Sequence, residues 1–393
     1  MSNRLFPLVL LLLLGCKQDQ GTTDSRLKAY FDSHNIPAAF MGSIDERGNV
    51  TFHAFGPSVW GGKDTITADH IFRIFSMTKA IASVAAMQLV EKGLITLDEP
   101  LNKLMPAMDS IPVFDEQGNL SHRHDTITLK HLLTHTSGFG YKFISSKLKG
   151  FKPEKWIYKD DPRLFKPGTA WNYGTSTDWV GRVIEKISGK DLETYIRENV
   201  TGPLKMNSTW FIVPASLSDK IVSWGMRDST GHFNEYPRIP DQPVTEFSAG
   251  GGLFSSPNDY LKFLHCMLNK GELDGVRILK KETVELMLQD HLPKGVNVEF
   301  GKPKGVSDSV VTGFLDTEGD RFGLAWAIEG NEKERIRPMK AVYWSGAANS
   351  YFTLDVNNQV AIAYFTQFFP FNDKESFGFY KLFEKEVYSG LKK

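Results

Sequence analysis

The sequence lacks the features that mark several specialised classes of protein. Its 393 residues include only 2 cysteines, Cys16 and Cys266, which excludes a disulfide framework and a cysteine-based zinc site. The sequence has no excess of either charge, because 46 basic side chains balance 46 acidic ones. Nucleic-acid binding usually needs a basic face, so the composition gives no support for it. Its N-terminal apolar run, Leu5–Leu14, is too short to span a bilayer as a mature helix. What is present, 41% apolar and 23% charged residues, is the composition of a globular protein.

The N-terminal run nevertheless indicates export. It follows Arg4 and ends in Leu13-Leu14-Gly15-Cys16, which resembles the lipobox of bacterial lipoproteins. In that family the cysteine is acylated and becomes the new N-terminus. The resemblance implies a signal peptide over residues 1–15, a lipid on Cys16 and a polar tether over residues 16–26, and a plain secretory signal is the alternative. We therefore expect a protein of the bacterial cell envelope, lipid-anchored and facing the periplasm or the exterior.

Strand-like patterns occur at both ends of the chain, and helical patterns occur between them. The expected strands are 38–44, 50–55, 322–328, 341–344, 351–356 and 360–365, and the expected helices are 27–34, 80–90, 128–134, 180–187, one starting at 257, and 374–391. These patterns predict an α/β (α+β) fold with one sheet built from both chain ends. The catalytic unit would cover residues 27–393, with its sheet part at about 27–93 and 300–393 and its helical part at about 94–299. A ligand cleft is expected between the two parts.

The first candidate catalytic motif is Ser76-x-x-Lys79. Three residues of helix place a hydroxyl and an amine on one face, and burial can lower the pKa of the lysine enough to leave part of it neutral. The spacing alone is weak, because about one match is expected by chance in a chain of this size, and Ser146-Lys-Leu-Lys149 is a second match in a basic loop. Ser76 differs because it lies where a strand-like run meets an apolar helix. The N-terminus of that helix also offers N–H groups to a developing oxyanion.

Five motifs in sequence order resemble the serine β-lactamase-related family. They are Ser76-Met-Thr-Lys79, Leu94-Ile-Thr-Leu-Asp-Glu-Pro100, Thr128-Leu-Lys-His-Leu-Leu-Thr-His-Thr-Ser-Gly138, Pro167-Gly-Thr-Ala-Trp-Asn-Tyr173 and Gly250-Gly-Gly-Leu253. The family contains class C β-lactamases, D-alanyl-peptide hydrolases and family VIII carboxylesterases. The resemblance covers residues 27–387. It implies a β-lactamase/transpeptidase-like fold, in which helices flank an antiparallel sheet and a further region is all-helical.

The second motif of that family, Tyr-x-Asn, reads Tyr173-Gly174-Thr175 in this sequence. The resemblance makes Tyr173 the third catalytic group, a phenolate base or proton relay beside Ser76 and Lys79; a core tyrosine is the alternative. Thr175 stands where the lactamases have an asparagine that contacts the substrate amide. That difference counts against recognition of β-lactams or peptides.

The third motif, Lys-Thr-Gly in the β-lactamases, reads Trp344-Ser345-Gly346-Ala347 here. Trp344 replaces a cation that would pair with a substrate carboxylate, and family VIII esterases and related acyltransferases similarly have Trp-x-Gly. Trp344 and Gly346 are therefore expected to line a pocket for an acyl or alkyl group, with core packing as the alternative for Trp344. By family position, the backbone N–H groups of Ser76 and Ala347 would form the oxyanion hole.

The remaining motifs predict no metal and no cofactor. His131 and His135 are four residues apart, but no glutamate follows the first of them, so the metalloprotease pattern fails. Neither a Gly-x-Ser-x-Gly nucleophile elbow nor a phosphate-binding P-loop occurs. The glycines at 250–252 are expected to let the backbone approach the cleft.

Together these residues predict a serine hydrolase that forms an acyl-enzyme on Ser76, with a carboxylesterase for small uncharged esters as the leading hypothesis. A β-lactamase, a D-amino-acid peptidase or an acyltransferase of the same family is an alternative. So is a non-catalytic lipoprotein that binds envelope peptide or glycan. The expected partners are a small-molecule ester or envelope-derived substrate and, through the N-terminal lipid, a membrane. The choice between Lys79 and Tyr173 as the base stays open.

Overall fold

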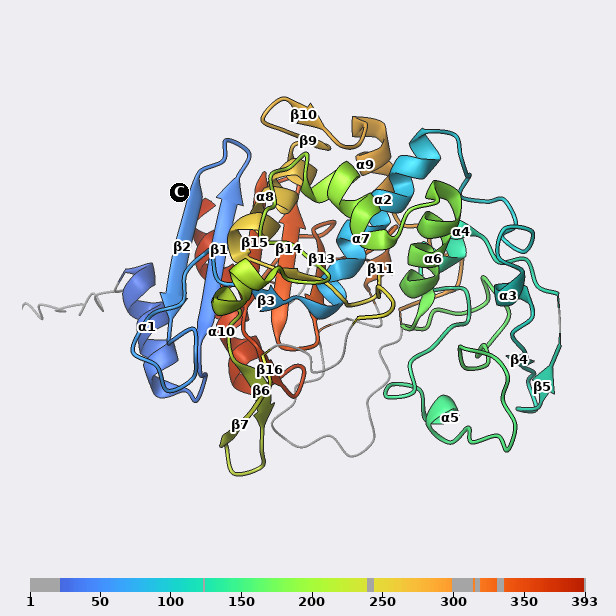
Figure 1. Ribbon diagram of the computed structural model, residues 1–393. Helices are drawn as coiled ribbons and strands as arrows, with labels where there is room; N and C mark the ends of the chain where they lie inside the picture. The colour runs from blue at the N-terminus through green and yellow to red at the C-terminus, as the bar shows by residue number, and fades with distance from the viewer. Residues whose placement is uncertain are drawn as a thin grey trace, which may run out of the picture.

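A seven-stranded antiparallel sheet built from both ends of the chain forms the core of the protein (Figure 1). The computed structural model describes residues 22–122, 124–238, 244–298, 314, 319–330 and 336–391. The strand order is β11-β12-β13-β14-β15-β1-β2. The strands are β1 (Ala39–Asp45), β2 (Val50–Phe55), β11 (Arg321–Phe322), β12 (Ala327–Ile328), β13 (Val342–Gly346), β14 (Ser350–Asp355) and β15 (Val360–Phe365). This confirms the expected antiparallel sheet made from both chain ends.

The helices cover the sheet and form a second region beside it (Figure 1). They are α1 (Thr23–Ser33), α2 (Thr78–Glu91), α3 (Pro106–Asp109), α4 (Leu129–Leu133), α5 (Ser146–Lys149), α6 (Ser176–Ser188), α7 (Leu192–Ile196), α8 (Pro257–Leu268), α9 (Lys281–Met287) and α10 (Lys374–Leu391), with the short turns η1 (Phe75–Met77), η2 (Arg197–Thr201) and η3 (Ala215–Lys220). Every residue of α2 from Thr78 to Leu89 is buried. This agrees with its nearly uniform apolar sequence, which predicts a helix enclosed on all sides.

Helices lie on both faces of the sheet. In β14, Tyr351 stacks on Tyr380 of α10 with ring centroids 4.8 Å apart, whereas Phe352 contacts Tyr260 of α8 at 5.7 Å. Successive side chains of a strand point to opposite faces, so α10 and α8 cover opposite sides. Because both faces are covered, β13, β14 and β15 are buried at every residue and show no polar alternation.

Local sequence signals place several helix ends where they were expected. Ser256 is the N-cap of α8, and its hydroxyl accepts a hydrogen bond from the Asp259 N–H at 3.2 Å, with Pro257 in the first turn. Gly189 ends α6 in the left-handed conformation, at φ 68°. Cys266, predicted to be a core thiol, is fully buried in α8, and burial raises its pKa to about 12.

The structure differs from the sequence-based expectation in three places. The run 322–328 is not one strand, because β11 and β12 form a hairpin of two short strands. The middle of the chain contains short strands as well as helices and loops: β3 (Phe72–Arg73), β4 (Val113–Phe114), β5 (Leu120–Ser121), β6 (Trp224–Arg227), β7 (Phe233–Tyr236), β8 (Phe254–Ser255), β9 (Glu272–Leu273) and β10 (Val276–Arg277), with β16 (Phe368–Phe369) beside β6. Helix α1 begins at Thr23 rather than Leu27, and its Arg26 forms an ion pair with Glu386 of α10.

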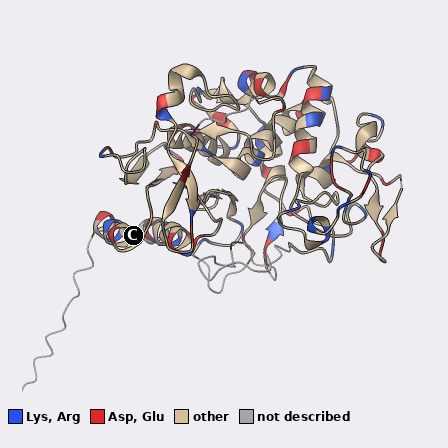
Figure 2. Ribbon diagram, turned by 60° about the horizontal axis from the view of Figure 1, so that its bottom comes forward, with Lys and Arg blue, Asp and Glu red and all other residues tan. Residues whose placement is uncertain are grey.

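Basic and acidic residues alternate along the same helices and loops (Figure 2). Among the residues that the structure describes, no helix has the length and apolar character needed to cross a membrane. Cys16 and the expected signal peptide lie outside the described residues. Lipid attachment and envelope localisation therefore stay predictions.

Candidate active site

Ser76 lies in a short turn between a strand and the central buried helix. β3 leads into η1, which contains Ser76, and α2 follows directly. Phe75, the residue before it, has φ 44°, a left-handed conformation that is costly for a residue other than glycine. The Tyr260 hydroxyl of α8 donates a hydrogen bond to the Met77 carbonyl at 3.1 Å. Ser76 is thus held in a strained and supported turn, and it remains partly exposed.

Lys79 is buried one helical turn after Ser76, and its ammonium group donates hydrogen bonds to three oxygen atoms. Nζ donates to the Gly250 carbonyl at 2.6 Å, to the Tyr141 hydroxyl at 3.2 Å and to the Ser76 hydroxyl at 3.3 Å. The side chain is only 1% exposed. A buried cation needs such partners, because leaving it without them costs several kcal/mol.

The electrostatic surroundings keep Lys79 protonated. Burial alone would lower the pKa of Lys79. Interactions with Tyr141, Tyr173 and Asp178 outweigh burial and raise this pKa above its ordinary value. The lowering expected from the sequence does not occur, because that expectation considered burial without these oxygens. Burial also raises the pKa of the Tyr141 phenol, and the nearby ammonium offsets this only in part.

Tyr173 lies on another side of the same ammonium group. Its ring centroid is 4.7 Å from Lys79 Nζ, and the side chain is 6% exposed. Gly174, the next residue, passes so close to another segment that a Cβ there would lie 2.2 Å from the Phe139 carbonyl oxygen. Only glycine permits that approach. The structure therefore brings Ser76, Lys79 and Tyr173 together, as the sequence predicted.

Tyr141 is the residue that the sequence analysis missed. Its hydroxyl accepts a hydrogen bond from Lys79, and its ring contacts that of Tyr173 edge-to-face at 5.4 Å. On its outer side it stacks on Phe143, which is 73% exposed. No spacing relates residue 141 to Ser76. The one available signal is that Tyr141 comes three residues after the Thr136-Ser-Gly138 segment.

A loop at residues 248–250 completes the surroundings of Lys79. Asp178, in the first turn of α6, accepts hydrogen bonds from the Ser248 hydroxyl at 2.6 Å and from the Gly250 N–H at 3.0 Å. A Cβ on Gly250 would lie 2.6 Å from an Asp178 carboxylate oxygen. The glycine thus lets the backbone reach Lys79, which is the role expected for it.

The Trp-x-Gly segment packs against Tyr173 and against the turn that contains Ser76. Trp344 of β13 is 2% exposed and meets Tyr173 edge-to-face at 5.1 Å, and its buried indole N–H has no hydrogen-bond partner among the residues that the structure describes. Gly346 ends β13 so close to the turn of Ser76 that a Cβ there would lie 2.4 Å from the Ile74 carbonyl oxygen. This approach brings Ala347 near η1. The pairing of Ser76 and Ala347 as oxyanion donors stays a prediction.

The other predicted residues have simpler surroundings. Thr175 is the N-cap residue of α6, but its side chain makes no capping hydrogen bond, and its role in substrate binding stays a prediction. His131 forms a capping box with Thr128 at the start of α4. His135 is buried 4.9 Å from the Tyr173 ring, and burial lowers its pKa well below the usual value. In the described part of the chain, no group of three or more His, Cys, Asp or Glu side chains could hold a metal ion.

The arrangement has the parts that acyl transfer needs. It offers a partly exposed hydroxyl at a supported turn, a protonated amine in contact with that hydroxyl, and two phenols beside the amine. Such a set can move a proton away from an attacking serine and return it to a leaving group.

Comparison with known proteins gives consistent results. The family model described as beta-lactamase matches residues 23–385. Monacolin J acid methylbutanoyltransferase from Aspergillus terreus is 29% identical over 386 residues, covering 91% of this chain and 92% of that protein. Lovastatin esterase from Penicillium rubens is 28% identical over 305 residues, covering 68% and 72%. The unliganded structure of simvastatin synthase from Aspergillus terreus is 28% identical, with a TM-score of 0.81 over 94% of this chain and 99% of that one.

Proposed function

The chain belongs to the beta-lactamase family, and from that premise we propose that it is a serine enzyme that takes an acyl group from an uncharged carboxylic ester onto Ser76 and passes it to an alcohol or to water. One observation carries the proposal. The Lys79 ammonium group contacts the Ser76 hydroxyl and the Tyr141 hydroxyl and lies over the Tyr173 ring. A serine nucleophile and two phenols are therefore gathered around one ammonium group.

The proposed reaction has two halves. A tyrosine beside Lys79, in the phenolate form that the ammonium group stabilises, accepts the proton of Ser76 and becomes a neutral phenol as the Ser76 Oγ attacks the ester carbonyl carbon. Backbone N–H groups of Ser76 and Ala347 stabilise the oxyanion. The bond to the alcohol oxygen then breaks, and the departing alcohol takes the proton from the phenol. A second alcohol or a water loses its proton to the regenerated phenolate and attacks the acyl-enzyme. The phenol then returns this proton to the Ser76 Oγ as the acyl group leaves.

Both relatives named above support this chemistry, because one is an acyltransferase and the other an esterase. An uncharged acyl group is supported by Trp344, which stands where β-lactamases have a lysine and supplies no cation for a substrate carboxylate. Its indole is 2% exposed and packs against Tyr173, so core packing is the alternative role. β-lactamase or D-amino-acid peptidase activity is accordingly the second candidate.

A comparison of ester and β-lactam turnover tests the proposal. We expect the wild-type protein to hydrolyse p-nitrophenyl butyrate, to cleave a chromogenic cephalosporin poorly, and to transfer butyryl to an added alcohol. Ser76→Ala should lose ester turnover by about a thousandfold or more, because the nucleophile is gone. Ser208→Ala, a change in another turn, is the control. Turnover that persists in Ser76→Ala would contradict the proposal, and an inert wild-type protein would favour a binding lipoprotein.

A further inference from the structure

Residues 142–159 form a strongly basic loop, although the whole chain carries no net charge. This basic loop contains one acidic residue, Glu154, and six lysines, all of them exposed: Lys142, Lys147, Lys149, Lys152, Lys155 and Lys159. Lys142 forms an ion pair with Asp161 at 2.9 Å, and Lys159 forms one with Glu246. Even with these two pairs, the loop presents an excess of positive charge, and such a surface attracts anions.

The basic loop also exposes large apolar side chains. Ile157 is 88% exposed and Phe143 is 73% exposed, the two highest values for large apolar residues in the described part of the chain. Phe143 directly follows Lys142, whose ion pair with Asp161 closes the loop. Ile157 precedes Asp161 by four residues, so their Cα atoms are at most about 14 Å apart. The two apolar side chains therefore lie near the same end of the loop, and exposed apolar groups gathered in this way mark an interaction site.

The inner side of the basic loop is packed against the protein. Leu148 of α5 is fully buried. The Phe151 ring meets Phe114 of β4 edge-to-face at 5.7 Å and Trp156 at 5.0 Å, and the Trp156 indole donates a hydrogen bond to the Asp160 carbonyl at 3.0 Å. In Figure 1, α5 lies at the outer edge of the helical region, away from the sheet. The loop is therefore a supported structure that displays its charged and apolar side chains outward.

This mixture of lysines and exposed apolar side chains favours a lipid surface over other partners. Lysine is depleted at protein interfaces, whereas at a membrane its charge meets anionic headgroups and its stem lies along apolar groups. Trp156, beside Ile157, is partly exposed, and tryptophan is enriched at the depth of the headgroups. A nucleic-acid strand needs free aromatic faces for stacking, but Ile157 has no ring and Phe143 stacks on Tyr141.

We propose that the basic loop binds an anionic phospholipid bilayer, with its lysines on the lipid phosphate groups and Ile157 and Phe143 among the headgroups. Neither the lipid predicted at Cys16 nor the proposed acyl transfer is needed for this contact. Phe143 stacks on Tyr141 at 4.8 Å, and Tyr141 contacts Lys79. The bilayer would therefore lie beside the candidate active site.

A dye attached at residue 157 tests the contact directly. The full chain carries Cys16→Ser and Ile157→Cys, so that Cys266, which is fully buried, is the only other thiol. The labelled protein is mixed with vesicles of phosphatidylcholine, either alone or with phosphatidylglycerol added. We expect the dye emission to shift to shorter wavelength on the anionic vesicles, with an affinity that falls as salt rises. The same dye on Ile212→Cys, at a position 51% exposed outside the loop, should not shift.

Substitutions in the labelled protein separate charge from apolar contact. Lys149→Glu, Lys152→Glu and Lys155→Glu together should lower the affinity for anionic vesicles by about a hundredfold or more, because each lysine near such a surface strengthens binding by about fivefold. Phe143→Ser should lower the affinity by about tenfold, because the bilayer no longer takes up the ring.

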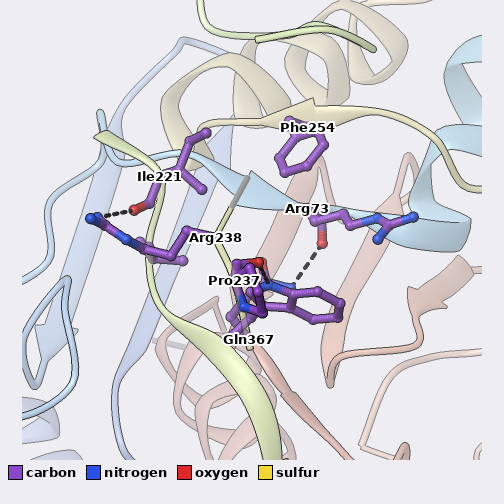
Figure 3. Close-up of a pocket in the computed structure, with 8 residues that line it drawn as sticks. Arg73, Ile221, Pro237, Arg238, Phe254 and Gln367 are labelled. Carbon is purple, nitrogen blue, oxygen red and sulfur yellow. Dashed lines mark hydrogen bonds between the residues drawn. The ribbon is translucent and has the colours of Figure 1, made fainter. Parts of the chain in front are cut away.

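Two controls change charge outside the basic loop. Lys63→Glu, Lys281→Glu and Lys385→Glu together alter the net charge by the same amount and should leave the affinity nearly unchanged, because salt screens charges that lie far from the bilayer. Arg238→Gln removes a cation that the protein itself uses. Arg238 donates a hydrogen bond to the Ile221 carbonyl at 3.1 Å, beside a pocket of about 70 Å³ (Figure 3).

The outcomes do not depend on ester turnover, so failure of the proposed acyl transfer leaves this test intact. Dye emission that stays the same on anionic vesicles, or an affinity that the triple lysine substitution does not lower, would overturn the proposal. Equal affinity for heparin and for anionic vesicles, with no loss in Phe143→Ser, would also overturn it and would indicate a general polyanion site.

Discussion

At the scale of single residues, Lys79 organises the candidate site. It is buried, and its hydrogen bonds reach three segments that are far apart in the sequence. Because Tyr141, Tyr173 and Asp178 outweigh burial and raise its pKa, we infer that it acts as a cation that stabilises a phenolate and an alkoxide. The proton acceptor is then a tyrosine, and two tyrosines are in position.

The two tyrosines can be compared directly. We expect Tyr141→Phe to lower kcat for p-nitrophenyl butyrate about 10- to 100-fold, because it removes one hydrogen bond to a charged group. Tyr173→Phe should lower kcat by about 10²- to 10⁴-fold if it supplies general acid–base catalysis. Tyr158→Phe, in the loop that follows Tyr141, is the matched control and should leave kcat unchanged. Wild-type kcat in Tyr141→Phe would show that its contact with Lys79 has no catalytic role.

At the scale of elements, the site depends on the close approach of β13 to the turn η1. Gly346 permits that approach because its missing side chain makes room for the Ile74 carbonyl. The proposed oxyanion donors are the N–H groups of Ser76, in η1, and of Ala347, the residue after β13. On this proposal their spacing depends on the Gly346 contact.

This contact gives a sharp prediction. We expect Gly346→Ala to reduce kcat/KM for p-nitrophenyl butyrate by about 10²- to 10³-fold, the effect of losing one oxyanion donor, because the added methyl group forces β13 away from η1. Gly390→Ala in α10, where nothing lies within 4 Å of the new Cβ, is the control. Activity close to wild type in Gly346→Ala would contradict the assignment of the oxyanion hole.

The elements also show what sequence patterns can and cannot predict. The hairpin of β1 and β2, the buried helix α2 and the capped helix α8 follow from local signals: a turn at Asp45–Gly48, an apolar run and Ser256 with Pro257. The Ser76 and Lys79 pair follows from helical spacing. Tyr141 does not, because its place beside Lys79 results from loop packing between Gly140 and Gly174. The sequence-based expectation that burial lowers the pKa of Lys79 was likewise wrong, because this pKa depends on oxygen atoms contributed by distant segments.

At the scale of the whole molecule, a buried ion cluster joins the sheet to its C-terminal helix. Arg337, before β13, lies 3.3 Å from Glu329 and 3.7 Å from Glu384 of α10, and all three side chains are fully buried. Thr353 and Tyr380 donate further hydrogen bonds to Glu384. Burial would raise the pKa of Glu384, but Arg337 and Lys381 outweigh it and hold this pKa at about 2.

Removing the cation should therefore destabilise the fold in a pH-dependent way. We expect Arg337→Met to lower the free energy of unfolding by about 3–5 kcal/mol at pH 7, because two carboxylates are left buried without it. Glu384 has a folded pKa below its ordinary value, so in the wild type its stabilisation is present above about pH 4.5 and is lost as the pH falls toward 2. In Arg337→Met this acid dependence should weaken. Denaturant unfolding at several pH values measures both effects, and the variant Arg47→Met, at an exposed position, is the control. Equal free energies of unfolding for Arg337→Met and the wild type would refute the role of the cluster.

The central claim is that Ser76 carries the acyl group, and peptide mass spectrometry of protein quenched during turnover tests it most directly. The protein is mixed with p-nitrophenyl butyrate, quenched in acid and digested. We predict a mass increase of one butyryl group, located on the peptide that contains Ser76 and absent from Ser76→Ala. It should disappear when an alcohol acceptor is added in excess. A butyryl group on another residue, or ester turnover with no dependence on Ser76, would contradict the account.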